Sequence, residues 1–163
     1  MIEHPVPKEH LRYIGDMTVS FALLEAAIQS LAHFLIADGQ RIGQIITAEL
    51  SFKNLKALVI SLYRERYGED ADYSTLKDLM NRVSNLEYKR NEITHSIWGV
   101  GRVPNSILRI KTTSKEKNGL QFKFEDYQVN QLAEIVSDIK KLADEIQLFW
   151  IHLLDNGEEK SNS

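Results

Sequence analysis

Three polar residues near the middle of the chain, Arg90, Asn91 and His95, have side chains that could perform acid–base chemistry on a phosphate. A histidine with an ordinary pKa of about 6.5 can pass protons at neutral pH, and an arginine can stabilise charge that develops on a phosphate. Together these groups are sufficient to cleave RNA without a metal, through the ribose 2′-hydroxyl. They lie in a segment of helical periodicity, where Arg90 takes a position that the pattern assigns to an apolar residue.

The spacing decides which of these side chains can meet. Asn91 and His95 share a helix face because they are four residues apart, whereas Arg90 and His95 are separated by about 140° on a regular helix. Arg90 and His95 could converge if the helix loosens at Thr94 and His95, or if two copies of the chain lie with these helices side by side. The alternative is a structural role, in which Arg90 forms a buried ion pair with Glu25, because an unpaired buried guanidinium is strongly unfavourable.

Apolar residues at alternating steps of three and four predict a mainly α-helical domain, an antiparallel up-down bundle of about four main helices. The expected helices run from Lys8 to Ala37 with a cap near Asp38-Gly39, from Ser51 to about Tyr67, from near Ser74 through the seam residues Ile93 and Ile97, and from about Tyr127 to Leu154. An alternating pattern predicts an inserted β-hairpin at about 106–125, with one apolar and one basic face and a turn at Asn118-Gly119. Residues 1–155 should form this single domain, followed by a disordered tail at 156–163.

The hexapeptide Arg90-Asn91-Glu92-Ile93-Thr94-His95 resembles the Arg, polar residue, spacer, His motif of HEPN domains, the family named for higher eukaryotes and prokaryotes nucleotide-binding. The expected layout, with a long first helix, the motif near the end of the third and a long closing helix, is also similar to that family. The resemblance implies a metal-independent endoribonuclease that uses no cofactor, forms a homodimer through the motif-bearing helices, and acts as a toxin with an antitoxin partner or as a phage-defence effector.

Carried onto this chain, the resemblance makes His95 the general base or acid, Arg90 the group that stabilises the phosphorane, and Asn91 the residue that orients His95 or the phosphate. Other HEPN domains keep the fold without chemistry. The alternative function is therefore a non-catalytic dimerisation or interaction module, in which Arg90 is held by Glu25.

Four basic residues in or beside the expected hairpin could bind an RNA backbone, namely Arg102, Arg109, Lys111 and Lys123. A solvated outer strand face, kept charged so that the sheet edge does not aggregate, explains the same residues equally well.

Composition limits the remaining classes. The chain has 163 residues, a net charge of −3 and no cysteine, which excludes disulfides and thiolate sites and makes the cytoplasm the expected compartment. The charge argues against a general nucleic-acid coating protein. The histidines other than His95 show no metal-ligand spacing, and we expect neither a metal site nor a membrane span. A second apolar column on the last helix, Val129, Val136, Ala143 and Trp150, predicts a homodimer.

Overall fold

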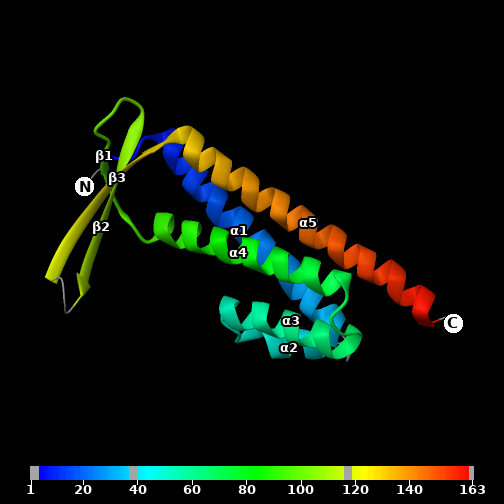
Figure 1. Ribbon diagram of the computed structural model, residues 1–163. Helices are drawn as coiled ribbons and strands as arrows, with labels where there is room; N and C mark the ends of the chain where they lie inside the picture. The colour runs from blue at the N-terminus through cyan, green and yellow to red at the C-terminus, as the bar shows by residue number, and fades with distance from the viewer. Residues whose placement is uncertain (1–3, 37–39, 116–118, 162–163) are drawn as a thin grey trace.

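The computed structural model describes residues 4–36, 40–115 and 119–161, which contain five helices and a three-stranded antiparallel sheet (Figure 1). The helices are α1 (Lys8–Ile36), α2 (Gln40–Ala48), α3 (Phe52–Tyr67), α4 (Ala71–Thr94) and α5 (Val129–Ser161), and the strands are β1 (Ile97–Val100), β2 (Ser106–Lys115) and β3 (Gly119–Gln128). The mainly α-helical class and the hairpin between the motif-bearing helix and the last helix are confirmed. The short helix α2 and the strand β1 were not predicted.

Side-chain caps set where α3 and α4 begin. The Ser51 hydroxyl accepts the backbone N–H of Asn54 at 3.3 Å, so α3 begins where the sequence indicated. The carboxylate of Asp70 accepts the N–H of Tyr73 at 2.8 Å, and α4 therefore begins at Ala71, earlier than the expected start near Ser74.

The helices do not alternate strictly in direction. α1 runs parallel to α3 and α5 and antiparallel to α4 (Figure 1). Phe52 at the start of α3 meets Phe21 with ring centroids 5.2 Å apart, while Arg66 at its end donates to the carbonyl of Leu35 at 3.0 Å. The reason is α2, which leads the chain back along α1, so that α3 begins again in the direction of α1.

The core consists of the apolar columns that the periodicity predicted. On α1 and α5 the buried residues include Met17, Phe21, Leu24, Ile28, Leu31 and Leu35, and Leu132, Ile135, Ile139, Leu142, Ile146, Phe149 and Leu153. The seam of α4 ends at Ile93, because Ile97 belongs to β1 and is 67% exposed. In the second column of α5, Ala143 and Trp150 line a groove against α1 of the same chain, so this column does not by itself require a second copy.

The ends of two helices differ from the expectation. α5 continues to Ser161, into the segment that was expected to be a tail, and residues 162–163 lie outside the described residues, as do Asn118 and the expected α1 cap at Asp38-Gly39. Among the described residues, α1 is long and apolar enough to cross a membrane by length and composition alone, and the expectation of no membrane span stays a prediction. A buried core helix passes the same test, and α1 contributes six large apolar side chains to the core.

Candidate active site

The C-terminal turn of α4 is fixed by side chains that cap its last carbonyl groups. His95 is the C-cap, and its backbone N–H donates to the carbonyl of Asn91 at 3.1 Å. The Ser96 hydroxyl donates to the carbonyl of Glu92, and the Trp98 indole N–H donates to that of Ile93 at 3.1 Å. Carbonyls that would otherwise lack partners are thus satisfied, and the backbone that carries His95 is held in place.

Asn91 and His95 lie in one groove, as their spacing predicted. The groove has a volume of about 470 Å³ and lies between the last turns of α4 and β2. Its lining comprises Tyr88, Asn91, Glu92, His95, Ser96 and Ile97 on one side and Arg109, Ile110, Lys111 and Thr112 on the other. Among the described residues, the edge of β2 beyond the short strand β1 has no ladder partner on that side, which leaves room for the groove.

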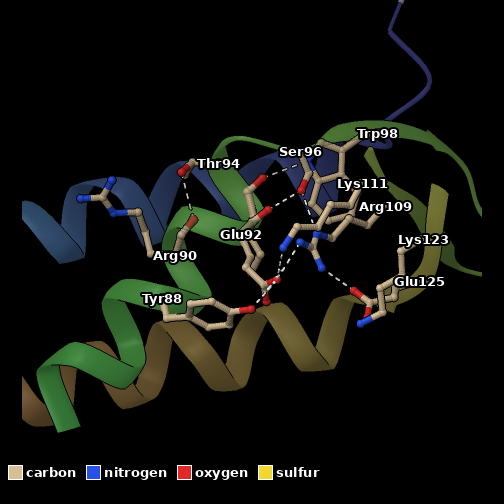
Figure 2. A network of polar contacts seen from close by, with 11 residues as sticks. Tyr88, Arg90, Glu92, Thr94, Ser96, Trp98, Arg109, Lys111, Lys123 and Glu125 are labelled. Atoms are coloured by element: carbon tan, nitrogen blue, oxygen red, sulfur yellow. Dashed lines mark hydrogen bonds and ion pairs between the residues drawn. The ribbon is translucent and has the colours of Figure 1, made fainter. Parts of the chain in front are cut away.

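The acidic residue of the groove, Glu92, is compensated by two cations (Figure 2). Its Oε1 accepts hydrogen bonds from the Tyr88 hydroxyl at 3.0 Å, from Arg109 Nη2 at 2.8 Å and from Lys111 Nζ at 3.3 Å. Burial alone would raise the pKa of Glu92, but these three hydrogen bonds outweigh it and lower the pKa below its usual value. Glu92 is therefore ionised at neutral pH, and its charge is balanced locally.

Arg109 is the centre of this network and is only 2% exposed. Besides Glu92 it binds the carboxylate of Glu125, and its Nε donates to the Ser96 hydroxyl at 2.8 Å. Burial would lower the pKa of Arg109, but the two carboxylates raise it above its usual value. The guanidinium of Arg109 on β2 thus binds Glu92 of α4, Glu125 of β3 and Ser96, the residue directly after His95.

Arg90 points away from this network, toward α1 (Figure 2). Its guanidinium carbon lies 4.4 Å from the centre of the Phe21 ring, which is cation–π distance, and its Nε is buried without a hydrogen-bond partner. Among the residues that the structure describes, no ion pair joins Arg90 to Glu25. The expected structural ion pair is therefore corrected, because an aromatic ring takes the place of the carboxylate. Within one chain, Arg90 and His95 face different neighbours.

The four residues expected to bind an RNA backbone all form ion pairs within the chain. Arg109 lies inside the protein, so the expectation that it faces RNA is corrected. Lys111 binds Glu92 and Lys123 binds Glu125 at 2.5 Å, while Arg102 binds Asp126 at 2.6 Å. Lys111 and Lys123 still retain exposed side chains, 39% and 68% respectively, and Arg102 is 59% exposed. These three remain accessible to a ligand.

Tyr88 and Ser96 are among the groove residues that the sequence reasoning missed. Tyr88 is three residues before Asn91 and seven before His95, so helical periodicity already assigns it to the same face. No such signal marks Ser96, whose role depends on the contact with β2.

Comparisons with protein-family models, with curated proteins and with solved structures gave no match. The resemblance to HEPN domains therefore stays a prediction from the segment Arg90 to His95 and from the layout of the helices.

Proposed function

We propose that this chain is a metal-independent endoribonuclease of the HEPN type, with its reacting groups in the groove of Asn91 and His95. The observation that supports it most is that these two side chains and Lys111 lie in one groove. The negative charge of Glu92 in this groove is already compensated by ion pairs with Arg109 and Lys111. At about 470 Å³ the groove is in the range of small-ligand sites, roughly 300 to 1,000 Å³.

The reaction needs one proton acceptor and one group that stabilises negative charge. Neutral His95 would take the proton of the ribose 2′-hydroxyl, and the 2′-oxygen would attack the adjacent phosphorus. The bond from phosphorus to the 5′-oxygen breaks, and the leaving oxygen receives a proton from the imidazolium of His95 or from water, which gives a 2′,3′-cyclic phosphate and a 5′-hydroxyl. Asn91 would orient His95 or the phosphate, and Arg90 would stabilise the phosphorane.

A homodimer would bring Arg90 of one copy to His95 of the other, since one chain does not join them. Exposed apolar residues on α1 and α5, with Val19 and Leu23 each 63% exposed and Leu148 65% exposed, support self-association through these two helices, whereas the composite site requires that the second copy contact α4. Light scattering should give twice the chain mass. A strict monomer at micromolar concentration would exclude the composite site.

The decisive experiment is cleavage of single-stranded RNA in EDTA. His95→Ala should lower the rate by about 10² to 10⁴, the usual contribution of a positioned general acid or base, and Asn91→Ala should lower it less. His152→Ala is the matched control, because His152 pairs with Asp72 on the surface at 3.2 Å and should leave the rate unchanged. Cleavage that requires Mg²⁺, survives His95→Ala or attacks DNA equally would contradict the proposal.

The alternative is a non-catalytic interaction module, and the stacking of Arg90 on Phe21 favours it. Arg90→Met separates the two functions because methionine keeps an apolar stem over the ring and loses the charge. A catalytic Arg90 predicts that cleavage falls while the melting temperature is kept. The non-catalytic module predicts no cleavage by the wild type, and a lower melting temperature for Arg90→Met because the cation–π contact with Phe21 is lost.

The biological setting follows from the resemblance alone. It would be a toxin with an antitoxin partner, or a phage-defence effector, in the cytoplasm. A neighbouring gene for a small nucleotidyltransferase-like antitoxin would support this setting.

A further inference from the structure

The sheet directs its charged face toward the helices and its apolar face outward. Trp98, Arg109 and Glu125 are ladder partners in one row, and Arg109 of this row binds Glu92 of α4. Since directly opposed residues share a face, the neighbouring row, Ile97, Ile110 and Phe124, lies on the other side. Ile97 is 67% exposed and Phe124 48% exposed, so this outer face remains open.

Two aromatic rings dominate the outer face toward the tip of the hairpin. Phe122 is 56% exposed, and its ring lies nearly parallel to that of Phe124, with an interplanar angle of 16° and centroids 6.3 Å apart. Two large exposed rings on adjacent outward positions of one strand are unusual for a solvated sheet, because each leaves a broad apolar surface in water.

These rings adjoin the candidate active site through the ladder. Ile110 and Thr112 line the groove that holds His95, and their ladder partners on β3 are Phe124 and Phe122. Neighbouring strands are about 4.8 Å apart, so the rings lie one strand beyond the groove wall. A ligand that occupies the groove can therefore extend onto them.

Cationic groups lie along the same hairpin. A second groove of about 510 Å³ is lined by Lys111, Thr113, Gln121, Phe122 and Lys123. Lys111 lines both grooves, and Lys111 and Lys123 are ladder partners. Lys111 binds Glu92 and Lys123 binds Glu125, so both lysines lie on the inward face of the hairpin, opposite the rings. Cations along the grooves and rings on the outer face match a single-stranded nucleic acid, whose backbone is anionic and whose bases stack.

We infer that Phe122 and Phe124 form a stacking platform for unpaired bases of single-stranded RNA next to the nucleotide whose phosphate faces His95. The inference rests on the proposed function for the position of the scissile phosphate. Stacking does not depend on which base is present, since every base has a π-face, so the platform selects unpaired over paired RNA without strong sequence preference.

Binding is measured in the full chain with His95→Ala, so that the RNA stays intact. The probe is a short single-stranded RNA that contains 2-aminopurine, whose fluorescence is quenched by stacking. Phe122→Ala together with Phe124→Ala should weaken binding by about 10- to 100-fold, the loss typical of removed base stacking, and should abolish the quenching. Phe122→Tyr with Phe124→Tyr should restore both, and Ile45→Ala, an apolar residue of α2 that is 67% exposed, is the matched control.

Three outcomes would overturn the inference. They are a less than twofold change in binding with unaltered melting temperature, an equal loss for double-stranded RNA, or dissociation of an oligomer with no loss of RNA binding. The last result would identify the outer face as a protein interface.

The two proposals fail separately. Cleavage of RNA by the wild-type chain with normal binding by the phenylalanine variants refutes the platform alone. Quenching that depends on Phe122 and Phe124 without any cleavage refutes the ribonuclease and supports the platform.

Discussion

Arg109→Met tests whether one buried guanidinium holds α4 to the sheet beside His95. Arg109 is 2% exposed and binds two carboxylates, so the substitution leaves Glu92 and Glu125 without their shared cation. Breaking a buried ion pair costs about 3 to 5 kcal/mol of folding free energy. Lys111 and Lys123 still compensate the two carboxylates, which are themselves 19% and 30% exposed, so we expect a smaller loss of about 2 to 4 kcal/mol.

Urea-induced unfolding, monitored by circular dichroism, measures this loss of folding free energy. For a chain of this size each kcal/mol corresponds to roughly 2 to 4 °C, so the melting temperature should fall by about 5 to 15 °C. Arg82→Ala is the matched control. Arg82 also binds a carboxylate through two nitrogens, at 2.5 and 2.7 Å from Glu145, but both partners are 43% exposed and the expected loss is below about 1 kcal/mol.

The pH dependence gives an independent check. The pKa values of Glu92 and Glu125 are lowered in the folded protein, so their contribution to stability is present above the unfolded value of about 4.3 and is lost as the pH falls through the folded values. The difference between the wild type and Arg109→Met should therefore narrow below about pH 4. A loss of less than 1 kcal/mol at pH 7, or a difference that widens in acid, would refute the account of this network.

Two further predictions concern other parts of the fold. Lys56→Met should destabilise the protein by about 1 to 3 kcal/mol in urea unfolding, because Lys56 is only 8% exposed and its Nζ lies 2.6 Å from the Glu87 carboxylate. An unchanged midpoint of the urea transition would contradict a stabilising role for this ion pair. Gly101→Ala should lower the melting temperature, because a Cβ there would lie 2.0 Å from the Ser106 hydroxyl oxygen. In contrast, Gly15 is at an exposed position of α1, and a Cβ there meets nothing within 4 Å, so Gly15→Ala should add about 0.5 to 1 kcal/mol of stability. Equal effects of the two substitutions would contradict the packing at Gly101.

The sequence correctly predicted those features of the fold that depend on residue spacing within a single element. The apolar columns of α1 and α5, the cap at Ser51 and the common face of Asn91 and His95 all follow from residue spacing within one element. The two faces of the hairpin followed from strict alternation in the same way.

Contacts between distant segments could not be read from the sequence. β1 exists because it pairs with β2. α2 is amphipathic, but its apolar residues Ile42 and Ile45 are 45% and 67% exposed, so they do not mark the core. Alternation defines two hairpin faces but not which one turns inward. The charged face turns inward because Arg109 finds Glu92 on α4, a pairing between residues far apart in the chain.

Arg90 illustrates the same limit. The sequence showed a cation in an apolar seam and suggested a carboxylate or a wet cleft as its partner. The ring of Phe21, itself a seam residue of α1, receives the guanidinium instead. Which seam residue meets which depends on how the helices pack, and periodicity on one helix does not determine that.

The central claim, that His95 and the groove around it cleave RNA without a metal, is tested most directly by the chemistry of the RNA ends. RNA incubated with the wild-type chain in EDTA should yield fragments with 2′,3′-cyclic phosphate and 5′-hydroxyl ends by mass spectrometry, and His95→Ala should yield almost none. Ends with 3′-hydroxyl and 5′-phosphate groups, or cyclic phosphate formed equally by His95→Ala, would contradict the account.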